Sequence, residues 1–385
     1  MRSLRLRHRR LLYTLRDSVS ISGVGLHSGI VANVRLRPAV AAGGIHFVRT
    51  DVPGEPRIRA QPSAVVSTML STTIGSHSGS ATVATIEHLM AALYGARVSA
   101  CRIEVDAPEL PVLDGSAAQW MRAINEAGLT RPMTCSTSLT ASPDAGMTPT
   151  SVVDLPVPVR VVDGESWAIA IPACSPRLSV GIDFASHAPI GRQWATWAPV
   201  EEDDEEEAGI KVTGHRGRVG GVAGTGDAGS SSDGGGGGGS SGGRGDRSGS
   251  NGRGRHGSSS DGAGSFEVEV APARTFALHE QLAALREAGL IKGGSLENAL
   301  VCDTERWLNG PLRFENEPAR HKLLDLVGDL ALLGPCLPRA HIVAYRSSHR
   351  LNHLLAQAIL ECQKTDATRE SSMCTTVTVG VKCSL

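Results

Sequence analysis

One stretch decides how this chain is interpreted: Arg320-His321-Lys322-Leu323-Leu324-Asp325-Leu326-Val327-Gly328-Asp329-Leu330. With the 3.6-residue period of a helix, its leucines and its valine cover one side, while His321, Asp325 and Asp329 follow another. An imidazole and a carboxylate four residues apart can bind one cation, and water-activating zinc sites use such nitrogen and oxygen ligands. An amphipathic helix with a polar solvent face explains the same pattern, so a metal site needs a third ligand from elsewhere.

The composition of the whole chain narrows its class. The 385 residues predict two domains of ordinary size with appendages. The 38 Lys+Arg balance the 39 Asp+Glu, so the net charge favours no nucleic-acid partner. The eight cysteines are scattered without a Cys-x-x-Cys pair, which favours reduced thiols in an intracellular protein over a disulfide framework. Since no run of about 18 apolar residues occurs, we expect no transmembrane segment.

The first third of the chain predicts mixed strands and helices. Alternating or half-buried patterns indicate strands at 32–36, 44–49 and 102–105. Apolar residues at helical spacing indicate helices at 85–93, with Thr85 as the N-cap, and at 116–127. We therefore expect a first α/β domain at 13–129, followed by a linker at 130–150 that is rich in Ser, Thr and Pro.

The remainder predicts a second α/β domain at 151–364. Its expected strands are 157–162, 167–171, 178–184, 298–301 and 340–345. Its expected helices are 274–288, 318–333 and 351–363. The tail at 365–385 shows no usable pattern.

A low-complexity insert at 200–264 interrupts the second domain. It opens with the acidic run 201–207 and continues with Gly and Ser, so it cannot bury enough apolar surface to offset its ordering entropy, and we expect disorder. Its Arg-Gly pieces around Arg244, Arg253 and Arg255 are similar to segments that contact single-stranded RNA, but they lack interleaved aromatic residues. An inert loop expansion is the favoured interpretation, because the cost of closing a loop grows slowly with its length.

The N-terminal segment is basic. Residues 1–12 hold five arginines, and no acidic residue precedes Asp17. This composition is typical of an organelle transit peptide, and a plain basic tail is the alternative. We expect a mitochondrial location, with the cytoplasm as the second possibility.

Two further places carry residues suited to a hydrolytic site. The pair Glu87-His88 lies in the first predicted helix, and Ser347-Ser348-His349 lies on the loop after the strand at 340–345. A glutamate beside a histidine ligand can hold a water molecule without binding the metal, and a nearby histidine can give a proton to a leaving amine. Taken singly, each has an ordinary explanation as helix surface or loop.

Nine short motifs, in order between about Tyr13 and Glu361, resemble one known family. They are 22–29 (SGVGLHSG), 68–72 (TMLST), 85–93 (TIEHLMAAL), 107–117 (APELPVLDGSA), 273–276 (ARTF), 293–299 (GGSLENA), 313–315 (RFE), 320–330 (RHKLLDLVGDL) and 348–352 (SHRLN). The family is that of the zinc-dependent UDP-3-O-acyl-N-acetylglucosamine deacetylases of lipid A biosynthesis. The resemblance implies an α+β fold of two similar two-layer βα sandwich domains, with the active site in the cleft between them.

The resemblance also implies a reaction and its residues. The reaction is hydrolysis of the N-acetyl group of UDP-3-O-(3-hydroxyacyl)-N-acetylglucosamine, with release of acetate. The implied roles are Zn2+ ligands (His88, His321, Asp325), general base (Glu87), general acid (His349), the carboxylate that orients this acid (Asp329), oxyanion stabilisation (Thr275) and substrate binding (Lys322, Phe184, Arg346). We expect a monomer whose ligand is the UDP-linked acylated glucosamine.

Three departures from the family pattern stand out. Ser348 replaces the glycine that precedes the acid histidine, Pro318 stands near the start of the ligand helix, and the linker and insert are additions. None removes an implied catalytic position, so we expect an active enzyme. A catalytically silent binding or scaffold protein with the same fold is the alternative, and an RNA-binding role of the insert is a third hypothesis.

Overall fold

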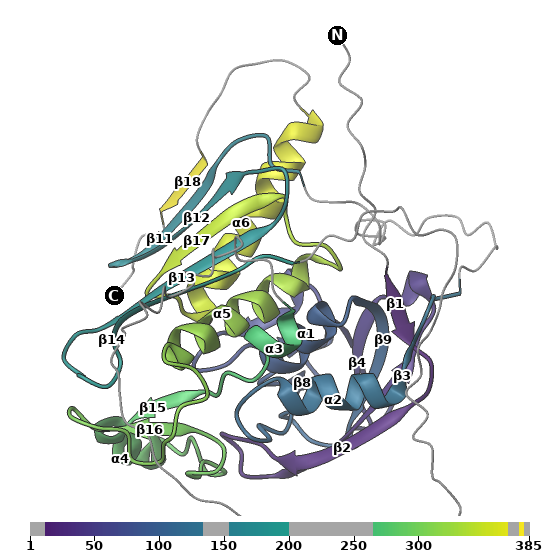
Figure 1. The fold of residues 1–385 in the computed structure, drawn as a ribbon. Coiled ribbons are helices and arrows are strands. Elements are labelled where there is room, and N and C mark those ends of the chain that lie inside the picture. Colours follow the sequence, from purple (N-terminus) through teal and green to yellow (C-terminus); the bar gives the residue numbers. More distant parts are fainter. Residues whose placement is uncertain (1–11, 134–153, 200–264, 369–376, 381–385) are drawn as a thin grey trace, which may run out of the picture. The chain divides into compact units, whose positions relative to one another are not determined.

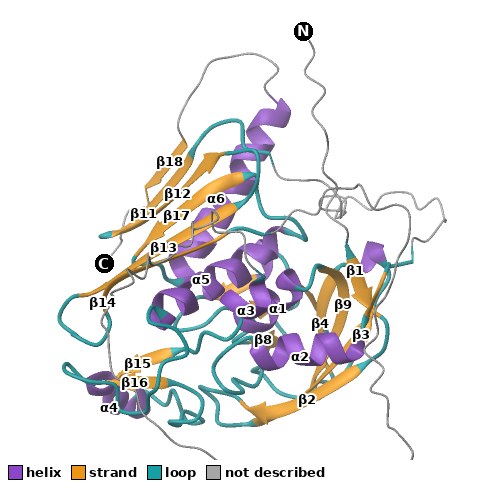
Figure 2. Ribbon diagram, viewed as in Figure 1, coloured by secondary structure: helices purple, strands orange, loops and turns teal. Residues whose placement is uncertain are grey.

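The computed structural model describes residues 12–133, 154–199, 265–368 and 377–380 (Figures 1 and 2). The basic segment before residue 12, most of the predicted linker and the whole insert at 200–264 lie outside the described residues. The described part is a mixed α+β structure with several sheets, which confirms the expected α+β class. Among the described residues, no helix is both long and apolar enough to cross a membrane.

A seven-stranded sheet dominates the first part of the chain. Its main order is β10-β1-β9-β3-β2, and β4 joins β9 and β5. The strands are β1 (Tyr13–Leu15), β2 (Val19–Val24), β3 (Val31–Pro38), β4 (Ile45–Arg49), β5 (Arg57–Arg59), β9 (Val98–Val105) and β10 (Leu129–Thr130). In β3 the buried residues Ala32, Val34 and Leu36 alternate with exposed ones, because successive side chains of a strand point to opposite faces.

Helices α1 (Glu87–Gly95) and α2 (Ala118–Ala127) accompany this sheet. Trp120 of α2 is among the largest fully buried side chains, and eight of the nine residues of α1 are buried. Smaller elements complete this part: η1 (Ala41–Gly43), η2 (Pro62–Ala64) and a three-stranded sheet of β6 (Val65–Ser67), β7 (Thr73–Gly75) and β8 (Thr82–Val83).

A six-stranded sheet of order β14-β13-β17-β12-β11-β18 forms the second part. Its strands are β11 (Val159–Asp163), β12 (Ser166–Pro172), β13 (Arg177–Phe184), β14 (Gly191–Trp197), β17 (Ala340–Tyr345) and β18 (Val377–Gly380). Helices α5 (Glu317–Leu330) and α6 (His349–Thr368) pack against it, and η4 (Ala331–Leu333) extends α5. The remaining elements are α3 (Phe266–Glu269), β15 (Phe276–Leu278), η3 (His279–Gln281), α4 (Leu282–Glu287) and β16 (Leu300–Cys302).

Helices α1 and α5 pack against each other between the two large sheets (Figure 1). They approach closely at Gly328, where a Cβ atom would lie 2.1 Å from the carbonyl oxygen of Glu87. Only glycine allows this approach, since every other residue would bring a Cβ atom into the backbone of α1. The contact places the start of α1 beside the C-terminal part of α5, so side chains of both helices can face one site.

Two predicted elements are wrong in type or extent. The expected helix at 274–288 is instead β15, η3 and α4, because Phe276 to Leu278 pair with β16. The last helix begins at His349 and not at residue 351, so His349 occupies a helix start and not a loop.

Three further details differ from expectation. Thr85 is not the N-cap of α1, because its hydroxyl donates to Glu109 Oε1 at 2.9 Å and Ile86 precedes the helix. The sequence analysis predicted neither β14 nor the shorter strands β1, β2, β5 to β8 and β10. The tail supplies β18, which pairs in parallel with β11 and was also not predicted.

Candidate active site

A pocket of about 250 Å³ lies where α1, α5 and the start of α6 meet. Its lining includes seven of the ten residues that the sequence singled out: Glu87, His88, Thr275, His321, Lys322, Asp325 and His349. An eighth, Asp329, touches the lining through a hydrogen bond to His349. The structure therefore brings together residues from distant parts of the chain.

Three buried side chains in this pocket form a candidate metal site: His88, His321 and Asp325. One ligand atom from each lies within 4.8 Å of the others. Asp325 Oδ1 is 3.4 Å from His321 Nε2 and 3.7 Å from His88 Nε2. This oxygen is buried and has no hydrogen-bond partner among the described residues, which an ion between the three atoms would explain.

The protonation states of the three residues suit a cation. Burial lowers the pKa of His88 to about 3, and burial also lowers the pKa of His321, so both rings are neutral at pH 7. Burial alone would raise the pKa of Asp325, but the nearby His321 and the charge of Lys322 outweigh it and lower that pKa. Metal ligands must be deprotonated, so this buried set of two imidazoles and one carboxylate fits a divalent ion such as zinc.

A hydrogen bond to the backbone orients the ring of His321. Its Nδ1 donates to the carbonyl oxygen of Ala273 at 3.1 Å, which leaves the lone pair of Nε2 facing Asp325. Such a bond to the far nitrogen fixes the tautomer that a metal ligand needs. The segment that carries Thr275 is thereby tied to the ligand helix.

A buried ion pair strengthens this tie. The carboxylate of Glu317, at the start of α5, accepts bonds from Arg274 N, Nε and Nη2 at 3.0, 2.8 and 3.1 Å. It also accepts a bond from the Arg313 backbone N–H at 2.6 Å. The position of Thr275 relative to His321 is therefore set by the bonds of the two residues before it, Ala273 and Arg274.

Glu87 has the properties of a general base. Burial, followed by the charges of Asp329 and Asp325, raises its pKa to about 7 although His349 acts in the opposite direction. Its Oε2 accepts a hydrogen bond from the Thr72 backbone N–H at 3.0 Å, and its Oε1 lies 3.8 Å from His349 Nε2. A carboxylate with such a pKa can both take up and release a proton near neutral pH.

His349 has the opposite character. Burial lowers its pKa, but the charges of Asp329 and Glu87 outweigh burial and raise it to about 9. Its Nδ1 donates to Asp329 Oδ2 at 2.9 Å. The imidazole is therefore protonated at pH 7, and its Nε2–H is available to a group in the pocket.

The predicted substrate-binding residues have different surroundings. Lys322 lines the pocket and donates to Asp325 Oδ2 at 2.9 Å. Phe184 and Arg346 are not among the described residues that line it. The ring of Phe184 packs edge-on against Phe276, with ring centroids 5.5 Å apart, and Arg346, just after β17, pairs with Glu165 and Asp183.

Two of the three departures from the family pattern, Ser348 and Pro318, lie within the described residues and cause no local disruption. The hydroxyl of Ser348 accepts a hydrogen bond from the Leu351 N–H at 3.2 Å, so this serine caps the first turn of α6. Pro318 occupies the first turn of α5, where the missing N–H costs nothing.

Three residues at the site had no role in the sequence analysis: His27, Thr72 and Asn352. His27 lines the pocket, and neither of its buried ring nitrogens has a hydrogen-bond partner among the described residues. Its backbone N–H donates to the buried carboxylate of Glu109 at 2.9 Å. The sequence could have pointed to His27 only through its position in the family motif 22–29, to which no chemical role was assigned.

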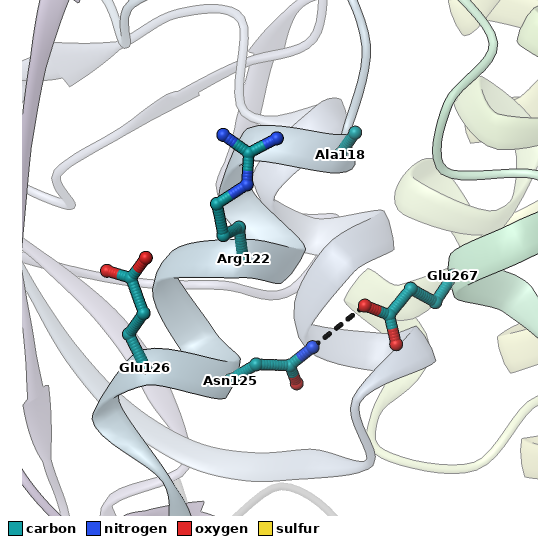
Figure 3. A pocket seen from close by; sticks show the side chains of 5 residues that line it. All are labelled: Ala118, Arg122, Asn125, Glu126 and Glu267. Carbon is teal, nitrogen blue, oxygen red and sulfur yellow. Dashed lines mark hydrogen bonds between the residues drawn. The ribbon is translucent and has the colours of Figure 1, made fainter. Parts of the chain in front are cut away.

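A second hollow of about 440 Å³ lies on α2 and α3 (Figure 3). It is lined by Ala118, Arg122, Asn125, Glu126 and Glu267, and Asn125 Nδ2 donates to Glu267 Oε1 at 2.9 Å. It is open to solvent, and its Asn125–Glu267 bond is exposed. It supports no second site.

Comparison with known proteins agrees with the geometry. The family model described as UDP-3-O-acyl N-acetylglycosamine deacetylase (LpxC) matches residues 13–208 and 253–361. A protein of Trichormus variabilis named UDP-3-O-acyl-N-acetylglucosamine deacetylase is 41% identical, over 90% of this chain and 98% of that protein. One of the same name from Synechocystis is 39% identical, over 91% and 98%.

A plant relative is more distant. A protein of Arabidopsis thaliana named probable UDP-3-O-acyl-N-acetylglucosamine deacetylase 1, mitochondrial, is 32% identical, over 90% of this chain and 87% of that protein. The residues that the family model matches cover most of the chain. They include all three residues of the buried cluster, His88, His321 and Asp325. The chain therefore belongs to the UDP-3-O-acyl-N-acetylglucosamine deacetylase family.

Proposed function

We propose that this protein hydrolyses the N-acetyl group of a UDP-linked 3-O-acylated N-acetylglucosamine and releases acetate, the committed step of lipid A biosynthesis. The observation that carries the proposal is the meeting of His88, His321 and Asp325 in one buried cluster beside Glu87 and His349. Family membership supplies the substrate class. A scaffold that had lost catalysis would have no need to keep these five groups together.

Zinc is the proposed metal, held by His88 Nε2, His321 Nε2 and one oxygen of Asp325. When bound, zinc polarises a carbonyl group and lowers the pKa of water to about 7. Two nitrogen ligands and one carboxylate are a common catalytic set that leaves a position open for water or substrate. In this arrangement Lys322 keeps its bond to the second oxygen of Asp325, which holds the carboxylate in one orientation.

Proton transfer is assigned to two neighbouring residues of the pocket lining, Glu87 and His349. Glu87 would take the proton from the attacking water, since its raised pKa makes it an effective base near pH 7. His349 would give its Nε2 proton to the departing glucosamine nitrogen, because Asp329 keeps the imidazole charged. The 3.8 Å between Glu87 Oε1 and His349 Nε2 lets both groups address one reacting centre.

The negative charge that develops on the acetamide oxygen needs a hydrogen-bond donor to stabilise it. Thr275 lines the pocket on the segment that His321 and Glu317 hold in place, and we assign its hydroxyl to this oxyanion. We assign Lys322 to the diphosphate of the substrate. Phe184 and Arg346 remain predicted contacts to the uridine end, at a greater distance from the pocket.

The same proposal covers the domain layout. The ligands come from α1 and α5, which accompany different sheets, and this supports two similar two-layer βα sandwiches at about 13–129 and 151–364 with the site in the cleft between them. A monomer suffices, because every group assigned above belongs to one chain.

The location is proposed from composition and relatives together. The Arg-rich residues 1–12 and the mitochondrial plant relatives favour import into mitochondria, while the cyanobacterial relatives favour the cytoplasm as the second possibility. A fusion of residues 1–16 to a fluorescent protein decides between these locations in a plant or algal cell.

Acetate release by the purified protein tests the function. We expect release from the UDP-linked substrate, loss of release with a metal chelator, and recovery on adding zinc. Glu87→Ala and His321→Ala should each reduce the rate on the order of 100-fold or more. Glu126→Ala and His77→Ala, on the exposed surface, are the matched controls and should keep the wild-type rate. A wild-type protein that folds, binds zinc and releases no acetate would favour the silent scaffold.

A further inference from the structure

Thr72, just before β7, touches two carboxylates of the site at once. Its backbone N–H donates to Glu87 Oε2 at 3.0 Å, and its hydroxyl donates to Asp329 Oδ1 at 2.5 Å. The residue is 2% exposed, so water does not compete for these bonds. One residue from the first part of the chain therefore binds the proposed base and the carboxylate behind the proposed acid.

These contacts close a ring of four residues. From Thr72 the ring passes to Asp329, whose Oδ2 accepts a bond from His349 Nδ1 at 2.9 Å. It closes between His349 Nε2 and Glu87 Oε1, which lie 3.8 Å apart and belong to residues that both line the pocket. The oxygen of Glu87 that Thr72 binds is the one turned away from this gap, which leaves Oε1 free to accept a proton.

We propose that Thr72 is a positioning residue that fixes the orientations of Glu87 and Asp329, and through Asp329 that of His349. The proposal deepens the function given above and rests on the roles proposed there for Glu87 and His349. The hydroxyl determines the rotation of the Asp329 carboxylate, because it occupies Oδ1 and leaves Oδ2 for the imidazole. The backbone N–H performs the same task for Glu87.

Asn352 supports the arrangement from the other side. Its Nδ2 donates to Asp329 Oδ2 at 2.9 Å, and its Oδ1 accepts a bond from the Ser347 hydroxyl at 2.8 Å. Among the described residues, Asp329 thus has three side-chain donors, of which only Thr72 donates to Oδ1. Without the Thr72 hydroxyl, a buried carboxylate oxygen loses its donor, and rotation of the carboxylate toward other donors becomes favourable.

Thr72→Val and Thr72→Ser form a matched pair for the test. Valine keeps the shape and the backbone N–H but lacks the hydroxyl, whereas serine keeps both donors. We expect Thr72→Val to lower kcat for acetate release about 10- to 100-fold with little change in KM, and Thr72→Ser to restore most of the loss. Thr72→Ala, which also lacks the hydroxyl, replaces the valine variant if valine prevents folding. A wild-type kcat in a variant without the hydroxyl overturns the proposal.

A double-mutant cycle separates positioning from general damage. In an Asp329→Ala background, Thr72→Val should cause almost no further loss, because the group through which the hydroxyl acts is gone. A purely structural threonine would reduce the rate by the same factor in both backgrounds, and that result would also overturn the proposal.

A readout that does not need activity distinguishes this inference from the proposed function. Crystal structures of the Thr72→Val and Thr72→Ser proteins should show the Asp329 carboxylate rotated in the first and unchanged in the second. An unchanged Asp329 in the valine protein refutes the positioning role, even if the wild-type protein releases no acetate. Conversely, an inactive wild-type protein with a rotated Asp329 in the valine variant refutes only the proposed function.

Discussion

The Nδ1 of His349 donates to Asp329 Oδ2 at 2.9 Å, and this single bond turns the other ring nitrogen toward Glu87. The charge of Asp329 also keeps the imidazole protonated, since burial alone would lower the pKa of His349. Orientation and charge of the proposed acid therefore depend on one carboxylate.

Asp329→Asn should therefore alter the pH dependence of the reaction. The acid must be protonated, and its pKa of about 9 sets the pH above which activity is lost. Without the negative charge this pKa falls, so the basic limb of the kcat/KM profile should move to lower pH, with a loss of about 10- to 100-fold at pH 8. Profiles of the wild-type protein and of the exposed control Asp17→Asn should coincide; an unmoved basic limb in Asp329→Asn would refute the assignment of His349.

Removal of the metal should reduce stability as well as activity. Three buried ligands contribute to folding when they share an ion, and an ion that binds only the folded state stabilises it by mass action. Chelation should therefore lower the Tm by about 5 °C or more. In the Asp325→Ala protein the chelator should leave the Tm unchanged. Equal shifts in the two proteins would place the bound metal elsewhere.

Gly328→Ala tests the crossing of α1 and α5. The added Cβ atom would lie 2.1 Å from the Glu87 carbonyl oxygen, so one helix must move. We expect a loss of about 1–3 kcal/mol in the free energy of unfolding, with a fall in kcat because Glu87 moves. Gly43→Ala, whose Cβ atom would meet only Val40 at 3.9 Å, is the control. Denaturant unfolding followed by circular dichroism gives the free energy of unfolding of both variants. Equal stability of the two variants would contradict the close packing.

Glu317→Gln tests the ion pair behind Thr275. The carboxylate is fully buried and accepts bonds from Arg274 and Arg313, so loss of its charge leaves the Arg274 guanidinium without its partner. We expect about 3 kcal/mol of destabilisation by denaturant unfolding. The exposed pair Arg16–Asp17 is the comparison, and Asp17→Asn should change the stability by less than about 1 kcal/mol. A neutral effect of Glu317→Gln would mean that water or another group replaces the pair.

Site residues could be predicted from the sequence where they lie on one helix at helical spacing. His321 and Asp325 lie on one face of α5 because their spacing matches the helical period, and this was predictable without a structure. That His88 joins them was not derivable from spacing, since the contact depends on how α1 crosses α5. The family resemblance supplied it, and the buried cluster agrees.

The errors have physical causes that differ. Strand β14 was missed because Trp194 faces solvent while its neighbour Gln193 is partly buried, which breaks the expected apolar alternation. The helix predicted across Phe276 was wrong because pairing with β16, a tertiary contact, overrides local helical preference. By contrast, Val377 and Val379 of β18 alternate with Thr378, which is the pattern of a strand.

The contacts of Thr72 mark the limit of such reasoning. Its partners Glu87 and Asp329 lie 15 and 257 residues away in the sequence, and a threonine in a short motif predicts neither bond. A hydroxyl that orients a distant carboxylate becomes visible only when both lie in one pocket.

Because α1 contributes one of the proposed metal donors and α5 contributes two, the proposed metal site is divided between the segments before and after the insert. A fragment that ends at residue 199 would carry a single donor, and a fragment that starts at 265 would carry the other two. Neither fragment has all three donors. If the two fragments are mixed and the metal ion elutes with them on gel filtration, they have reassembled. The amount of bound cation would thus measure how much of the two fragments has reassembled.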